Sequence, residues 1–215
     1  MAEFSTIAIG SDFVVGLNQF SVTGAIHIGA PTTQAITPTK EGLQFATKPA
    51  AKILQAQRSG WTFNKLAPYE SWESFSSEGR ELWHKYREIA RPEGIVRVAL
   101  RYVNRLDLPL PMVDFKEYIL TIPDIAPALP QSLSGFFMQL HIPQVDIDAL
   151  AVLNVAMVPP EAANTCSIVL DIDVFRTETV AQGEDDLWAY FEILREKKNH
   201  IFESCITEAM RRRFA

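Results

Sequence analysis

The segment from Ile95 to Leu108 constrains the fold most, because its side chains alternate between two kinds along a long strand. Successive side chains of a strand point to opposite faces of a sheet. One face would carry Arg97, Arg101 and Arg105, and the other would be mostly apolar. The sequence therefore predicts a sheet with one cationic face and one face that other elements bury.

Two segments have the apolar periodicity of amphipathic helices. The first begins after Ser71, a good N-cap, and is stopped by Pro92. The second is predicted from about Glu184 to Arg213, with acidic residues in its first turn and arginines in its last, as the helix dipole favours. The expected buried stripe of the first helix comprises Trp72, Phe75, Gly79, Leu82, Trp83, Tyr86, Ile89 and Ala90.

Shorter β-rich segments complete the element order. Predicted strands lie at 42–47, 51–57, 61–66, 136–142, 150–158 and 166–175, after one or two strands within 13–28. This order favours an α+β fold, in which a curved antiparallel sheet has two long helices on one face and the elements form two related halves. A single sheet that holds only the C-terminal helix is the alternative.

The expected domain organisation follows from the same order. Residues 1–41 would form N-terminal strands and a polar loop, and residues 42–215 would form a single α+β domain. The halves of this domain would span about 42–93 and 94–215.

The composition is that of an ordinary globular protein, with 47% hydrophobic and 21% charged residues. No apolar run approaches the roughly 20 residues that cross a bilayer, and no secretion signal is evident, so we expect a cytoplasmic protein. A net charge of −6 opposes nucleic-acid binding as a main role. Cys166 and Cys205 have no spacing typical of a disulfide framework or a zinc site.

Polar residues on two predicted strands are candidate binding residues. Arg101 and Arg105 would lie about 13 Å apart at about 3.3 Å per residue, which suits a longer anion or an acidic partner. Asp171 and Asp173 share a strand face and could hold a divalent cation with water and phosphates. If the two strands pair with matching faces, the carboxylates would instead neutralise the arginines. Asn104 would lie on the apolar face, where its amide needs a partner.

A polar band interrupts the apolar stripe of the C-terminal helix at Lys198 and Asn199. If either residue faces inward, it needs an acidic or carbonyl partner, which Asp171 or Asp173 could supply. A lysine that snorkels at the helix edge is the alternative. Since the sequence contains no nucleophile elbow, phosphate loop or metal-ligand spacing, we predict no catalytic residue, metal or cofactor.

Four groups of residues occur together in this chain. They are Gly94-Ile95-x-Arg97 with Arg101-Tyr102-x-Asn104-Arg105, Leu133-Ser134-Gly135-Phe136-Phe137, Leu170-Asp171-Ile172-Asp173-Val174-Phe175, and Leu187-Trp188 with Leu194-Arg195-x-x-Lys198-Asn199-x-Ile201-Phe202-Glu203. From about Gly42 to its C-terminus the chain resembles a sporadically distributed family of uncharacterised prokaryotic proteins. Members of that family open with a proline-containing strand that residues 4–28 do not reproduce. The resemblance implies no established activity.

The leading functional hypothesis is a non-enzymatic protein-interaction or oligomerisation module, because no complete catalytic constellation is present. Its partner would be another protein or a second copy in a homodimer, and neither a membrane nor nucleic acid is expected. The alternative is a domain that binds a small molecule or anion, or hydrolyses a substrate with a metal, through Arg101, Arg105, Asp171 and Asp173.

Overall fold

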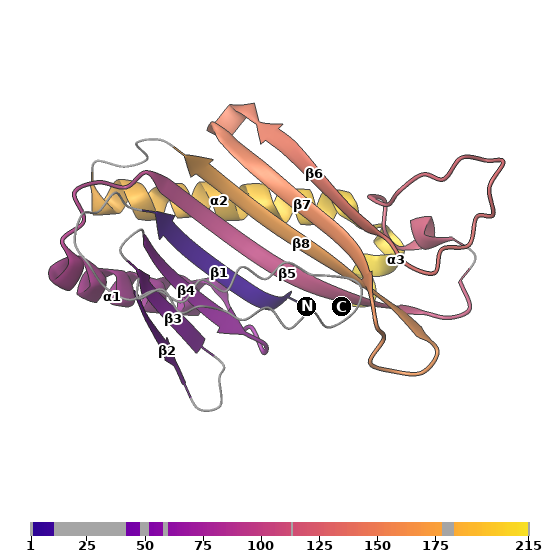
Figure 1. Cartoon of the computed structure of the whole chain (residues 1–215), viewed down its shortest axis with the longest axis horizontal. Helices are drawn as coiled ribbons and strands as arrows, with labels where there is room; N and C mark the ends of the chain where they lie inside the picture. The colour runs from indigo at the N-terminus through magenta and orange to yellow at the C-terminus, as the bar shows by residue number, and fades with distance from the viewer. Residues whose placement is uncertain are drawn as a thin grey trace.

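The computed structural model describes residues 2–10, 42–47, 52–57, 60–112, 114–177 and 183–214. Within them, eight antiparallel strands form one sheet in the spatial order β2-β3-β4-β1-β5-β8-β7-β6 (Figure 1). This confirms the predicted α+β class. The strands are β1 (Ala2–Gly10), β2 (Gly42–Ala46), β3 (Lys52–Gln57), β4 (Gly60–Leu66), β5 (Arg97–Pro109), β6 (Phe137–Gln144), β7 (Ala149–Val158) and β8 (Thr165–Thr177).

The same element order occurs twice along the chain. In the first half, β1 pairs with the last strand of the meander β2–β3–β4, and helix α1 (Trp72–Ala90) follows. In the second, β5 pairs with the last strand of the meander β6–β7–β8, and helix α2 (Glu184–Cys205) follows. The antiparallel pair β1–β5 joins the halves at the centre of the sheet. The topology thus agrees with two related halves, but the first half includes β1, which lies outside the expected bounds of about 42–93.

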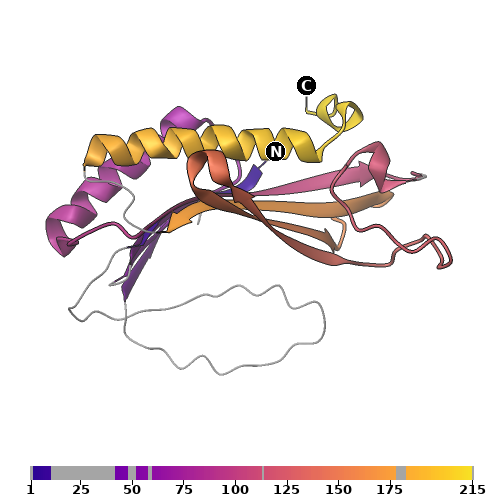
Figure 2. The same cartoon turned by 90° about the horizontal axis from the view of Figure 1, so that it is seen from above.

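Both long helices lie on one face of the sheet, as predicted (Figure 2). Helix α1 begins where the Ser71 side chain accepts a hydrogen bond from the Ser74 N–H, and it ends at Arg91 in the left-handed region before Pro92. Most of its predicted stripe is buried or partly buried. Ile89 is the exception, because 84% of it is exposed near the end of the helix.

The C-terminal helix is shorter than predicted. Helix α2 ends at Cys205 rather than near Arg213, because the backbone of Ile206 is extended and forms a bridge with Ile119. Thr207 then caps a separate short helix, α3 (Glu208–Arg211). The break lets Ile206, only 1% exposed, pack into the core, an outcome that the periodicity could not reveal.

The strands of both meanders agree with the predicted positions to within two residues. Strand β1 was not predicted, and the strands expected within 13–28 lie outside the described residues. Two single turns of 3-10 helix, η1 (Phe115–Glu117) and η2 (Val145–Ile147), interrupt the connections around β6. Among the described residues, no helix is long and apolar enough to span a membrane.

Candidate functional site

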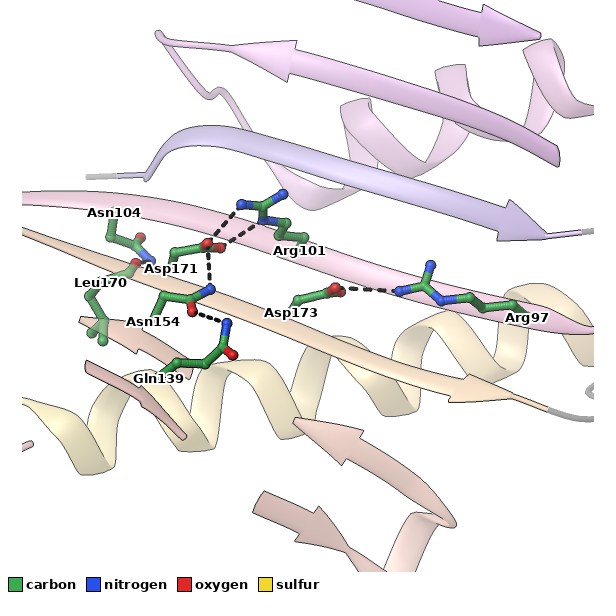
Figure 3. A network of polar contacts seen from close by, with 8 residues as sticks. All are labelled: Arg97, Arg101, Asn104, Gln139, Asn154, Leu170, Asp171 and Asp173. Atoms are coloured by element: carbon green, nitrogen blue, oxygen red, sulfur yellow. Dashed lines mark hydrogen bonds and ion pairs between the residues drawn. The ribbon is translucent and has the colours of Figure 1, made fainter. Parts of the chain in front are cut away.

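Polar side chains gather on the face of the sheet opposite the helices. Figure 3 shows them together with a separate contact of the other face, between Asn104 and Leu170. Arg101 on β5 donates two hydrogen bonds to the Asp171 carboxylate on β8, from Nε at 2.8 Å and from Nη2 at 2.7 Å. Asn154 on β7 donates to the same carboxylate at 3.0 Å and accepts a hydrogen bond from Gln139 on β6. One chain of polar side chains therefore crosses four adjacent strands. The hydrogen bonds that Arg101 donates to Asp171 raise the pKa of Arg101.

Asp173 pairs with Arg97, at 3.4 Å between Oδ2 and Nη2. The Arg97 guanidinium also lies over the Phe175 ring, 4.5 Å from its centroid. Burial raises the pKa of Asp173, and its Oδ1 atom has no hydrogen-bond partner among the described residues. The prediction that these carboxylates neutralise arginines is right for Asp171 with Arg101, but the second arginine is Arg97.

Arg105 lies at the other end of the same face and contacts neither predicted carboxylate. Its side chain forms ion pairs with Asp107 and Glu161 and donates a hydrogen bond to Ser167 at 3.1 Å. The Ser167 hydroxyl donates to Asp107, and this bond is the main cause of the lowered pKa of that carboxyl. Arg105 therefore belongs to a separate cluster near the end of β5.

Asn104 lies on the helix-covered face, opposite to the arginines. It is 7% exposed, and its amide donates to the Leu170 carbonyl oxygen at 3.2 Å. A backbone carbonyl oxygen thus provides the partner that the buried amide needs.

Lys198 belongs to α2, which packs on the helix-covered face of the sheet. Its Nζ is 3.7 Å from the centroid of the Tyr102 ring on β5. The suggested contact with Asp171 or Asp173 is wrong, because those side chains occupy the other face of β8. Burial, with a smaller effect of Arg195, lowers the pKa of Lys198 to about 8. Asn199 is exposed to solvent.

Lys198→Met is expected to stabilise the protein by about 1–2 kcal/mol at pH 7, because it removes a buried cation whose contact with Tyr102 offsets only part of the desolvation. The unfolded chain binds more protons at Lys198 between pH 8 and its ordinary pKa of 10.5. The stability advantage of Lys198→Met over the wild type should therefore shrink as pH rises above 8. Melting temperatures of both proteins from pH 7 to 9.5 test this. Lys197→Met, which removes an ion pair with Asp146, is the control and should not stabilise.

The second candidate binding surface is the outer edge of β6, the last strand of the sheet. Figure 1 shows no helix or strand of the described residues beyond it. Residues 137–144 include no Asp, Glu, Lys or Arg. Two apolar side chains of the strand are exposed, Phe137 by 51% and Ile142 by 37%. Natural edge strands are commonly protected by charges, prolines or bulges. Within β6, Pro143 is the only protecting residue of this kind.

The hydrogen bonds of the ladder show which backbone groups of β6 are free. The Met157 N–H donates to the Phe136 carbonyl oxygen at 3.0 Å, directly before the first residue of β6. Because bonded and non-bonded pairs alternate in an antiparallel ladder, the N–H and C=O groups of Phe137, Gln139 and His141 point away from β7. No backbone group of the described chain pairs with them.

A cavity of about 590 Å³ lies beside the C-terminal ends of β5 and β7 and the N-terminal end of β8. Residues of the connection from β5 to β6 also line it. Its lining includes Met112, Phe115, Met157 and Cys166, and the ion pair between Lys116 and Asp124 lies among the more exposed lining residues. Burial raises the pKa of the Cys166 thiol. None of the predicted site residues lines this cavity.

The face of the sheet opposite the helices, called the open face below, has few groups left among the described residues that could bind a ligand. Each of Arg97, Arg101 and Arg105 already contacts a carboxylate of the chain, so their charges are balanced internally. No group of three or more His, Cys, Asp or Glu side chains in the described ranges could hold a metal ion. Sequence reasoning missed Gln139 and Asn154, although the alternation of residues 150–158 would place Asn154 on the face opposite to Leu153 and Val155.

Comparisons with protein-family models, with curated proteins and with solved structures found no match to this chain.

Proposed function

We propose that this protein is a non-enzymatic interaction module that associates with a strand of another polypeptide at the free edge of β6. The observation that carries the proposal is an uncharged edge strand with exposed apolar side chains, whose outward backbone groups pair with no backbone group of the described residues. Strand addition satisfies such backbone groups and gives the added side chains a neighbouring surface. The partner is a second copy of the chain or another protein.

The open face supports this proposal more than it supports the alternative of an anion-binding or metal-dependent site. An anion at Arg101 would compete with a two-bond contact to Asp171, and a cation at Asp171 would have to displace both Arg101 and Asn154. The polar network instead fixes β5, β8, β7 and β6 relative to one another, up to the free edge. A rigid edge costs less entropy on strand addition than a mobile one.

His141→Pro is expected to abolish association, because proline removes the outward N–H of residue 141 without removing a hydrogen bond between β6 and β7. His141→Thr removes the same imidazole but keeps the N–H, so it serves as the matched control. Native mass spectrometry of gently purified wild-type protein should show a bound polypeptide, in the control as well but not in His141→Pro.

Two outcomes would contradict the proposal. One is the bare mass of 24.1 kDa for all three proteins. The other is a complex that His141→Pro leaves intact although the variant melts cooperatively, because association would then use another surface.

A further inference from the structure

We infer that the occupant of the β6 edge is the β6 strand of a second copy of this chain, paired antiparallel about a two-fold axis that passes between the two Leu140 residues. This inference rests on the proposed function and makes it specific. A two-fold axis perpendicular to the sheet pairs a strand antiparallel with its own copy, so that both molecules use the same surface.

The faces of the sheet limit the registers that such a pair can adopt. Helix-side residues of one copy must lie opposite helix-side residues of the other if the faces are to continue across the seam. Since side chains alternate along β6, the axis must pass at a residue position and not between two residues. The registers centred on Met138, Gln139, Leu140, His141 and Ile142 meet this condition.

An axis at Leu140 pairs seven of the eight residues of β6 and also gives every outward N–H of the strand an acceptor. With the axis there, residues 137–143 all pair with residues of the same segment in the other copy. Gln139 then lies opposite His141, and the outward N–H and C=O groups of each meet those of the other. The Phe137 N–H meets the Pro143 carbonyl, so every outward N–H of the strand has an acceptor. The lack of an N–H on Pro143 leaves only the outward Phe137 carbonyl without a donor.

A register centred one residue away on either side is less favourable. An axis at His141 also pairs seven strand residues, but it places Phe137 opposite Val145 of η2, so the outward Phe137 N–H meets no carbonyl of the strand. With the axis at Gln139, Pro143 would lie opposite Gly135, which lies before the strand, and Ile142 would have no strand residue opposite it. Centring at Leu140 also gives both exposed apolar side chains a partner, Phe137 against Pro143 and Ile142 against Met138.

Charge does not oppose a second copy at this edge. Each chain carries a net charge of −6, so two copies repel one another on most of their surfaces. The β6 strands bring no acidic or basic side chains together. The acidic residues at the adjacent end of the β6–β7 hairpin already have cationic partners, Asp146 with Lys197 and Asp148 with Arg176.

Disulfide crosslinking tests this register directly. Leu140 of one copy and Leu140 of the other would form a non-hydrogen-bonded pair, in which Cα atoms lie about 4.5 Å apart, within disulfide range. Leu140→Cys is therefore expected to convert most of the protein to a covalent dimer under mild oxidation. Met138→Cys alone and Ile142→Cys alone should form no disulfide between copies, whereas a mixture of these two variants should crosslink.

The wild-type protein is the control for the native thiols, since Cys166 and Cys205 are both buried. If Leu140→Cys is destabilised, the mixture of Met138→Cys with Ile142→Cys tests the same register independently. Crosslinking of Met138→Cys only with Leu140→Cys, or of Leu140→Cys only with Ile142→Cys, would place the axis elsewhere and overturn the inference.

Other results separate this inference from the proposed function. A native mass that shows one chain bound to a different protein, lost in His141→Pro, would overturn the homodimer and leave strand addition standing. A bare chain in every variant would overturn both. Long polymers would indicate pairing of β6 with the opposite edge strand β2, which does not close at two copies.

Discussion

Replacing Trp83 with alanine is expected to lower the free energy of unfolding by about 3–5 kcal/mol. Trp83 lies on the sheet-facing side of α1 and is 1% exposed. Its ring is 5.9 Å from that of Trp61 on β4 and 5.4 Å from that of Tyr86. The alanine variant would leave a cavity where α1 meets the first half of the sheet, and a melting temperature lower by roughly 6–20 °C is expected for a chain of this size.

Urea denaturation of wild-type and variant protein measures this loss. Ile89→Ala is the matched control, because Ile89 lies on the same helix with 84% of its surface exposed, and it should change the stability by less than about 0.5 kcal/mol. Trp83→Phe should cost less than the alanine variant, since the indole Nε1 has no hydrogen-bond partner among the described residues. A loss below about 1 kcal/mol for Trp83→Ala would mean that α1 does not pack on the sheet as described.

The elements with strong periodicity were predictable from the sequence because a single physical signal fixed each of them. In β5 the alternation of arginines with apolar residues gave both the strand and its two faces, and burial follows that alternation from Leu100 to Leu108. In α1 the Ser71 cap and Pro92 marked both ends. Strand β1 carries no such mark, and its place between β4 and β5 depends on pairing with residues far along the chain.

The site was harder to predict because register decides which charges meet. From alternation alone, Asp173 could face either Arg101 or Arg105. In the structure Arg101 lies directly opposite Asp173 in the ladder, yet its guanidinium reaches diagonally to Asp171. Asp173 then pairs with Arg97, four residues before Arg101. A shift of two residues keeps every side chain on its face, so no burial pattern in the sequence distinguishes these pairings.

Arg101→Met is expected to destabilise the protein by about 3 kcal/mol, because among the described residues it leaves the buried Asp171 carboxylate only the Asn154 amide as a side-chain partner. Asp171 is 3% exposed, so solvent cannot replace the lost guanidinium. The melting temperature should fall by roughly 6–12 °C. Asp171→Leu should cost less, since the Arg101 side chain is 43% exposed and can be hydrated when its partner is removed.

The double variant Arg101→Met with Asp171→Leu separates a structural ion pair from a binding site. Because neither charge remains, most of the loss caused by Arg101→Met should be recovered, and the double-mutant cycle should give a coupling energy of about 2 kcal/mol. Thermal scans with phosphate and with Mg²⁺ test whether this face binds a ligand. A structural pair predicts no ligand-dependent shift in the wild type, whereas stabilisation by either ion that the double variant loses would show that this face binds ligands and would favour the anion-binding or hydrolytic alternative.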